Sequence, residues 1–183
     1  GRLHVLNISE LSQITMVEAY DMPGRASGIC TSGDLALVSG VWDYGFQVLD
    51  ISDMRSVDYV GRYDGGWMSS DVEFAEDLVY SCSYSSLHIV DLTIPSSPAI
   101  VSTLDALVPD EAYNDIELLG GYGIAAFGDG GIQVLDLSHV SNPYPLVEYD
   151  TGWTVDVAIH GSFAFVADDV SGLVVLDLSS CFH

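Results

Sequence analysis

Six residues recur five times along the chain: HVLNIS at 4–9, QVLDIS at 47–52, HIVDLT at 88–93, QVLDLS at 133–138 and VVLDLS at 174–179. The fourth residue of each copy is polar, and these markers are Asn7, Asp50, Asp91, Asp136 and Asp177. Consecutive markers lie 41 to 45 residues apart. A period of this length is typical of a protein built from one supersecondary unit per repeat. The repeat therefore decides the architecture.

Each repeat contains short apolar runs separated by Gly, Asp, Ser and Pro, which is the pattern of strands and turns. In the third repeat the four runs lie at 71–76, 78–84, 87–93 and 99–104. Four antiparallel strands in about 40 to 45 residues are typical of one propeller blade, whereas a β-sandwich would not need so regular a period. We therefore predict an all-β fold, a β-propeller of four-stranded antiparallel blades with about four to five repeat units.

The predicted propeller is a single region, residues 1–183, whose units lie at about 1–22 (partial), 23–66, 67–106, 107–152 and 153–183 (partial). The first unit has only its third and fourth runs, and the last lacks its fourth. Pairing the two ends would leave one strand to spare, so we predict an incomplete ring. Either the chain is a segment of a longer propeller, or copies associate to finish the ring. The start at Gly1, without an initiator Met, suggests a processed product or a piece of something longer.

A family resemblance accompanies the repeated phrase. The phrase follows a strand such as FAFVAD at 163–168 and precedes a turn such as TIPSSP at 93–98 or SHVSNP at 138–143. In this arrangement it resembles the LVIVD repeat, and the resemblance covers essentially the whole chain. It implies a bacterial or archaeal propeller, secreted or on the cell surface. It implies no particular reaction.

The charge of the chain is strongly negative. It has 27 acidic residues against four Arg and no Lys, for a net charge of −23. Such a surface repels phosphate backbones and anionic lipid, so we expect no nucleic-acid binding, and no apolar run is long enough for membrane insertion. Cations and basic partners are favoured. The acidity suits either a secreted protein or a high-salt organism.

The three cysteines, Cys30, Cys82 and Cys181, lack metal-ligand spacing and allow at most one internal disulfide. We expect buried free thiols.

The histidines also offer no catalytic set. His4 and His88 occupy the strand position that holds Gln47 and Gln133 in other repeats, which favours packing over catalysis.

One rim of the predicted propeller collects aromatic and acidic loop residues. They are Trp42, Asp43, Tyr44, Trp67, Tyr84, Tyr113, Asp129, Trp153, Asp168 and Asp169. Rings that stack and carboxylates that accept hydrogen bonds suit a carbohydrate or a cationic ligand. The alternative, which we favour, is that the rings cover the blade tops and the Asp residues build turns.

Asp also recurs at the start of the first strand of three repeats, as Asp71, Asp115 and Asp156, where Gly28 takes the matching place in the second repeat. Innermost strands surround a propeller axis, so these carboxylates are candidate ligands for Ca²⁺. For most of the recurring aspartates, the markers that end the third strand included, we predict that the side chain satisfies turn or neighbouring-blade amides.

No nucleophile elbow, phosphate-binding glycine loop or zinc motif is present in the sequence. We therefore predict a non-catalytic extracellular or cell-surface propeller, a structural or protein-interaction module that joins a protein partner or itself through open blade edges. The alternative is a glycan-binding or Ca²⁺-binding propeller, or a propeller enzyme, that uses the acidic and aromatic rim.

Overall fold

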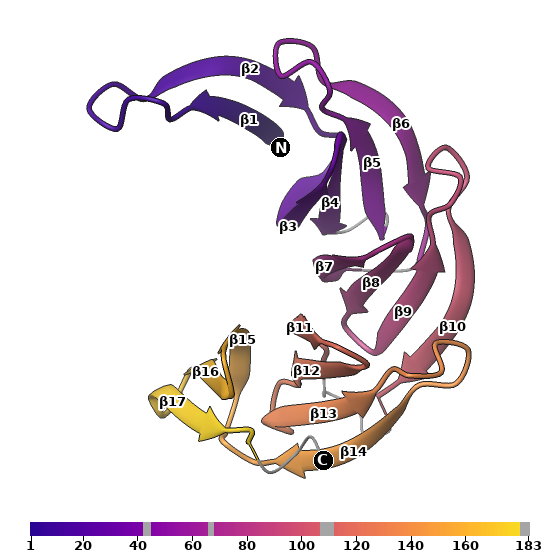
Figure 1. Ribbon diagram of the computed structural model, residues 1–183, viewed down its shortest axis with the longest axis vertical. Coiled ribbons are helices and arrows are strands. Elements are labelled where there is room, and N and C mark those ends of the chain that lie inside the picture. The colour runs from indigo at the N-terminus through magenta and orange to yellow at the C-terminus, as the bar shows by residue number, and fades with distance from the viewer. Residues whose placement is uncertain (42–44, 66–67, 107–111, 180–183) are drawn as a thin grey trace.

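The computed structural model describes residues 1–41, 45–65, 68–106 and 112–179 (Figure 1). Within these ranges all regular secondary structure is β, as seventeen strands in five antiparallel sheets. In chain order the sheets contain β1 (Arg2–Asn7) and β2 (Thr15–Asp21); β3 (Arg25–Ser32), β4 (Leu35–Val41), β5 (Phe46–Asp50) and β6 (Asp58–Tyr63); β7 (Ser69–Ala75), β8 (Leu78–Ser83), β9 (Ser86–Asp91) and β10 (Ala99–Asp105); β11 (Asp115–Leu119), β12 (Tyr122–Ala126), β13 (Ile132–Asp136) and β14 (Tyr144–Tyr149); and β15 (Thr154–His160), β16 (Phe163–Asp168) and β17 (Gly172–Asp177).

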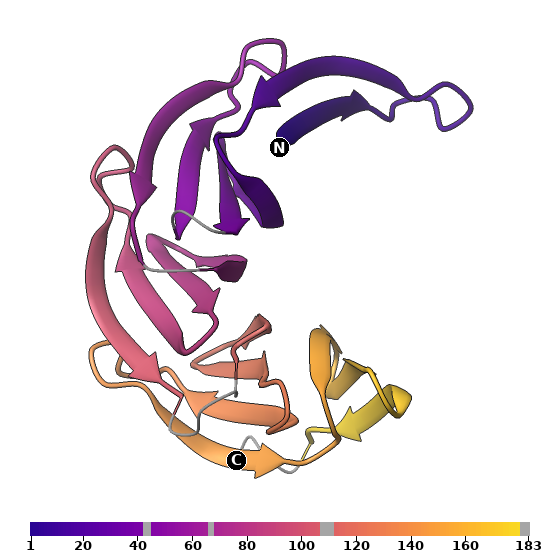
Figure 2. The ribbon, with the colours of Figure 1, turned by 180° about the vertical axis from the view of Figure 1, so that it is seen from behind.

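The five sheets stand side by side around an arc, and the view from behind shows the same order (Figures 1 and 2). In each four-stranded sheet the first strand lies nearest the axis and the fourth lies outermost. This is a β-propeller of four-stranded antiparallel blades, as predicted. The arc is open between the β15–β17 sheet and the β1–β2 sheet, which contain the counterparts of strands one to three and of strands three and four.

The repeated phrase forms the end of the third strand and the turn after it. Each marker side chain accepts a hydrogen bond from the backbone N–H two residues later, at 2.8–2.9 Å; the acceptors are Asn7, Asp50, Asp91, Asp136 and Asp177. Hydrogen bonds from the side chain and the backbone N–H of the Ser or Thr two residues later lower the pKa of each of the four aspartates. The prediction that the markers satisfy turn amides is confirmed, and it explains why the slot holds Asp or Asn.

Turns between the first and second strands need a left-handed residue. Gly33, Gly120 and Gly161 take this place with φ of 56°, 61° and 61°. In the β7–β8 turn the same place holds Glu76, with φ of 56°. Glycine adopts this conformation without a steric penalty, whereas a residue with a Cβ is strained there.

The core lies between the sheets, because each blade is apolar on both faces. We call the face toward the next blade along the chain the forward face, and the opposite one the rear face. Between the last two blades, Ile124, Ile132 and Val134 of a forward face pack on Val157 and Val166 of a rear face. Three further clusters join the other neighbouring sheets in the same way. Each fully buried side chain of this size contributes about 1.5–3 kcal/mol.

Two cysteines fall within the described residues, and both are free: Cys82 is buried and Cys30 half-buried. Burial, with nearby carboxylates, raises the pKa of both thiols, so they stay protonated at neutral pH. Cys181 lies outside the described residues. No helix among the described residues has the length and apolar character of a membrane span.

Candidate functional site

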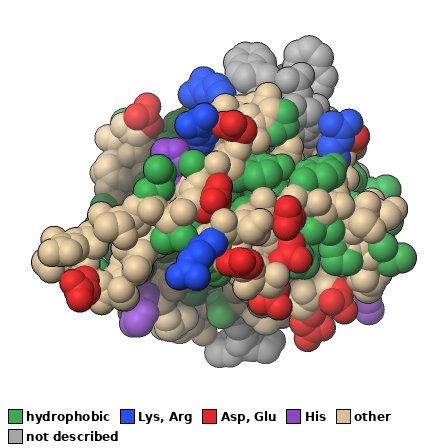
Figure 3. Space-filling model, turned by 90° about the horizontal axis from the view of Figure 1, so that it is seen from above, with side chains coloured by type: hydrophobic (Ala, Val, Ile, Leu, Met, Phe, Trp, Pro, Cys, Tyr) green, Lys and Arg blue, Asp and Glu red, His purple; other side chains and the backbone are tan. Residues whose placement is uncertain are grey.

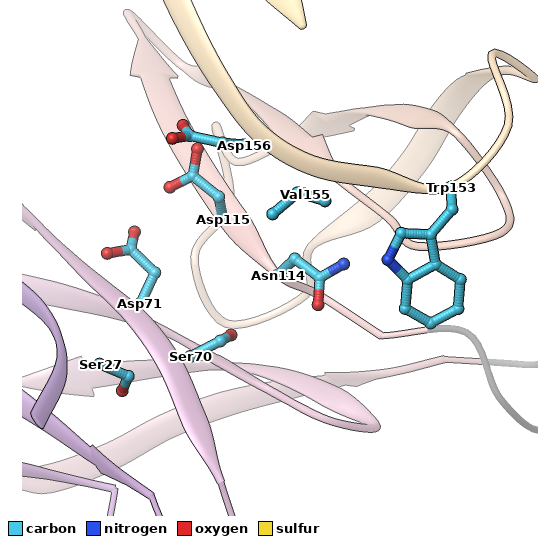
Figure 4. A pocket seen from close by; sticks show the side chains of 8 residues that line it. All are labelled: Ser27, Ser70, Asp71, Asn114, Asp115, Trp153, Val155 and Asp156. Carbon is cyan, nitrogen blue, oxygen red and sulfur yellow. The ribbon is translucent and has the colours of Figure 1, made fainter. Parts of the chain in front are cut away.

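A pocket of about 470 Å³ opens at the axis, where the first strands of neighbouring blades converge (Figure 4). Its walls come from four successive blades and are mostly polar, with one indole. The lining residues are Ser27, Ser70, Asp71, Asn114, Asp115, Trp153, Val155 and Asp156. Three of them are the aspartates that the sequence indicated as candidate Ca²⁺ ligands.

The polar residue that precedes each first-strand Asp position joins its blade to the next one. Its side chain donates a hydrogen bond to a backbone carbonyl oxygen at the start of the following blade. The bonds run from Ser27 to Ser69, from Ser70 to Tyr113 at 2.7 Å, and from Asn114 to Thr154 at 2.7 Å. In the last sheet the same position holds Val155, which has no group to donate.

The carboxyl groups also contact the following blade and one another. Asp115 Oδ2 accepts the backbone N–H of Val157 at 2.8 Å. The Asp115 side chain is hydrogen-bonded as well to those of Asp71 and Asp156. In Figure 4 the Asp115 and Asp156 carboxyl groups lie side by side, and Asp71 extends toward them across the pocket. The three groups form a ladder along the inner strands.

Gly28 leaves room for this ladder. A Cβ on Gly28 would stand 2.6 Å from Asp71 Oδ1 and 2.9 Å from Asp71 Cα, which no side chain tolerates. The glycine that interrupts the Asp series in the sequence is therefore the residue against which the first carboxyl of the ladder packs.

Burial sets the protonation of the ladder. It raises the pKa of Asp115 to about 9, helped by the hydrogen bond with Asp71 and opposed by the N–H of Val157. Burial likewise raises the pKa of Asp71, and that of Glu73 and Glu117 beside it. Asp115 is thus a neutral acid at pH 7 that can donate a hydrogen bond, because an uncompensated buried carboxylate is costly.

The Ca²⁺ interpretation of Asp71, Asp115 and Asp156 stays a prediction. Among the residues that the structure describes, no group of three or more His, Cys, Asp or Glu side chains is placed to hold a metal ion. The Asp115 carboxyl instead shares hydrogen bonds with those of Asp71 and Asp156. A hard cation requires several oxygen ligands around it at about 2.3–2.6 Å.

The predicted rim residues are spread over several environments. Trp153 is half-buried in the axial pocket, and its carbonyl oxygen accepts the N–H of Asp169 at 2.9 Å. Asp168 is buried next to Gly152 and accepts the N–H groups of Val170 and Ser171. The structure therefore brings Trp153, Asp168 and Asp169 together.

The other described rim residues do not join them. Tyr113 is 1% exposed; its ring packs 4.7 Å from that of Phe127, and its hydroxyl donates to Gln133 Oε1 at 2.7 Å. It is a core residue between blades, not a surface ring. Tyr84 and Asp129 are exposed in the β8–β9 and β12–β13 connections. Trp42, Asp43, Tyr44 and Trp67 lie outside the described residues.

Sequence reasoning missed the residues that join the blades, Ser27, Ser70 and Asn114. The signal was present, because each directly precedes the first-strand Asp position, in the pairs Ser27-Gly28, Ser70-Asp71 and Asn114-Asp115. Small polar residues in loops are common, and only the strand register shows that these three point at the next blade.

The family model of the LVIVD repeat matches residues 23–65, 112–151 and 152–181, more than half of the chain. The chain belongs to the LVIVD repeat family. The LVIVD matches cover the sheets β3–β6, β11–β14 and β15–β17. The β7–β10 sheet lies outside the matched ranges and forms the same four-stranded blade. No curated protein matches the sequence.

Solved structures show the same fold at low sequence identity. The β-propeller domain of Myceliophteria thermophila Cps50 (Swd1) is 10% identical with a TM-score of 0.73, covering 96% of this chain and 63% of that one. The computationally designed Ika4 protein is 12% identical with a TM-score of 0.69, covering 87% and 94%. The designed Ika8 protein is 12% identical with a TM-score of 0.66, covering 85% and 46%. Since 514 chains match in structure, the fold alone selects no function.

Proposed function

We propose that this LVIVD-repeat propeller is a non-catalytic protein-interaction module whose end sheets bind protein partners. The main evidence is that both end sheets expose apolar side chains at repeat positions where the inner blades bury them. Single exposed apolar residues need no explanation, but contiguous apolar faces mark binding surfaces.

The forward face of the β15–β17 sheet is the first of these surfaces. Phe165, Leu173 and Val175 are 37–69% exposed. Their counterparts one blade earlier, Ile124, Ile132 and Val134, are at most 5% exposed, because the β15–β17 sheet covers them.

The rear face of the β1–β2 sheet is the second. Leu6, Ile8 and Ile14 are 50–62% exposed. Their counterparts one repeat later, Leu49, Ile51 and Val57, are at most 8% exposed and pack beneath the β1–β2 sheet. The two end faces therefore have the composition of a blade interface and lack its partner within the described residues.

The outer edge of β17 adds a third open feature. In each complete blade a fourth strand pairs with the third, as β14 does with β13. Beside β17 there is instead an apolar groove of about 300 Å³, whose lining includes Val147, Tyr149 and Val175. An unpaired strand edge next to an apolar groove can accept an added strand.

A double substitution tests the proposal. Phe165→Asp with Val175→Asp should lower the binding of a hydrophobic fluorescent dye at least about two-fold and leave the unfolding midpoint within about 3 °C, since exposed positions contribute little to stability. Ile100→Asp is the matched control, because Ile100 is 51% exposed on the outer strand β10. Unchanged dye binding together with destabilisation of about 3 kcal/mol, as in a core, would contradict it.

The proposal includes an extracellular or cell-surface location. It is supported by the location that the LVIVD resemblance implies, and by the excess of 27 acidic over four basic residues. Protease treatment of intact cells that express the native gene is the test. Digestion of the protein while a cytoplasmic marker survives is expected, and protection of both would refute this location.

The axial pocket supports a second candidate function, the binding of a carbohydrate or a cationic ligand. The favouring observation is that Trp153, Asn114 and the carboxyl ladder line one pocket of about 470 Å³. An indole stacks on sugar or cationic faces, and the polar groups fix orientation. A calorimetric titration with a glycan panel, and with Ca²⁺ against EDTA, tests it. Heat that disappears in Trp153→Ala supports the site, and no heat from any ligand counts against it.

A further inference from the structure

The four interfaces between neighbouring sheets follow one rule, in which an apolar forward face packs on an apolar rear face. The free forward face of β15–β17 and the free rear face of β1–β2 are therefore the two halves of one more interface, held at opposite ends of the arc (Figure 1). Building on the proposed function, we propose that the partner is a second copy of this chain, bound head to tail: the β15–β17 sheet of one copy packs on the β1–β2 sheet of the next.

Val155 distinguishes this partner from a further complete blade. In the inner blades, Ser27, Ser70 and Asn114 donate to carbonyl groups at the start of the next blade's first strand. A further complete blade after β15–β17 would offer the same acceptor, yet the position holds Val155, which is 50% exposed. The β1–β2 sheet corresponds to strands three and four and has no inner strand. An apolar residue at 155 fits a partner that offers no carbonyl there.

The distribution of charge favours head-to-tail contact over contact between two carboxyl-terminal ends. All four Arg residues, Arg2, Arg25, Arg55 and Arg62, lie in the first 62 residues, beside eight acidic residues. Residues 63–183 contain the other 19 acidic residues and no Lys or Arg. Figure 3 looks onto the part of the molecule that carries β1, β2 and the β5–β6 loop, and shows Arg side chains among acidic and hydrophobic ones. Residues 1–62 therefore have a net charge of −4 and residues 63–183 a net charge of −19, so a carboxyl-terminal end repels an amino-terminal end less than it repels a second carboxyl-terminal end.

The contact is heterologous, since it joins two different faces, so a pair of copies keeps one free face of each kind for further copies. The net charge of −23 opposes any association of copies and is screened by salt. Association should therefore strengthen with both protein concentration and ionic strength. An assembly held by ion pairs alone would weaken with salt.

Sedimentation velocity of the whole chain, at rising concentration and at two salt concentrations, is the first measurement. Wild-type protein is expected to pass from monomer to dimer or larger species, at lower concentration in high salt. Phe165→Asp and Ile8→Asp should each weaken association at least about ten-fold, and Ile100→Asp should not. Leu173→Asp and Leu6→Asp replace either end variant that does not give the wild-type circular dichroism spectrum.

Mixing the two end variants tests the direction of the contact. Phe165→Asp protein keeps an intact β1–β2 face and Ile8→Asp protein keeps an intact β15–β17 face, so their mixture should form a one-to-one dimer that neither forms alone. Two monomeric variants that fail to combine would overturn head-to-tail docking. A wild-type chain that stays monomeric in high salt and still binds the hydrophobic dye would overturn the second copy as partner, while leaving the end faces open for another protein.

Discussion

Two sets of aspartates recur at the same period and behave in opposite ways. The set that ends the third strands, which includes Asp50 and Asp136, receives hydrogen bonds from its own turns, first from the Ser52 and Ser138 side chains and then from their N–H groups, and these bonds lower the pKa of each. In the set on the first strands, Asp71 and Asp115 are half-buried next to other carboxyls, and this burial is the main cause that raises the pKa of both. Repeat position therefore fixes where a carboxyl stands, and its surroundings decide whether it is ionised.

The largest effect is expected from adding an aspartate to the first strand of the β3–β6 blade, where Gly28 takes the Asp position. Gly28→Asp would place a Cβ within 2.6 Å of Asp71 Oδ1 and add a fourth buried carboxyl. We expect a loss of about 3 kcal/mol or more in the free energy of unfolding, measured by urea denaturation. Gly121→Asp is the control, because the nearest atom to its Cβ position is 3.7 Å away. Equal stability of the two variants would show that the axis has room for another carboxyl.

The pH dependence of stability separates the two sets next. The pKa of Asp115 in the folded protein, about 9, exceeds the ordinary value of about 3.9, so the folded state binds this proton more tightly. Its contribution is complete below about pH 4 and is lost as the pH rises through about 9. Asp115→Asn keeps an acceptor for Val157 and removes the titration.

The free energy of unfolding of the Asn variant should therefore rise relative to wild type by up to about 1.4 kcal/mol per pH unit between about pH 4 and pH 9, in chemical denaturation across that range. Parallel profiles for the two proteins would contradict a protonated Asp115.

For the aspartates that end the third strands, the change of stability with pH has the opposite sign. The pKa of Asp136 is lowered by hydrogen bonds with Ser138 and Tyr144, so its stabilising effect is present above about pH 4 and is lost on acidification. Asp136→Ala should lower the unfolding midpoint by about 2–3 °C at neutral pH and by less near pH 3, in differential scanning calorimetry. Asp136→Asn, which keeps the acceptor, should lower it less; an Asn variant as unstable as the Ala variant would argue against the turn bond.

The smallest expected effect is on Cys30, whose thiol pKa is raised first by burial and then by Glu73 and Asp71. Glu73→Gln should speed alkylation of Cys30 only about two- to three-fold, because burial remains. The rate is measured by mass spectrometry in a Cys181→Ser background. A change of a hundred-fold or more would mean that charge, not burial, protects the thiol.

Features that depend on local sequence signals could be predicted, whereas features that depend on the neighbouring blade could not. The propeller, the strand count of the end sheets and the role of the markers were predictable, because period and turn chemistry are local. His88 also occupies its predicted packing slot, where it is half-buried between Tyr63 and Ser86. Tyr113 was predicted on the rim and is buried, since the direction of a loop aromatic depends on the neighbouring blade. That the three first-strand aspartates bind a cation stays a prediction, because the sequence places the groups together but does not give their protonation.

Glu76 shows that one blade tolerates a strained residue in its first turn. It occupies the left-handed turn position that three other blades reserve for glycine, at a cost of about 1–2 kcal/mol. Its blade, β7–β10, is flanked by complete blades on both sides and lies outside the family matches. The blade is nevertheless complete and still carries the repeated phrase, as HIVDLT at 88–93. Packing against two complete neighbours therefore offsets the strain of one turn residue.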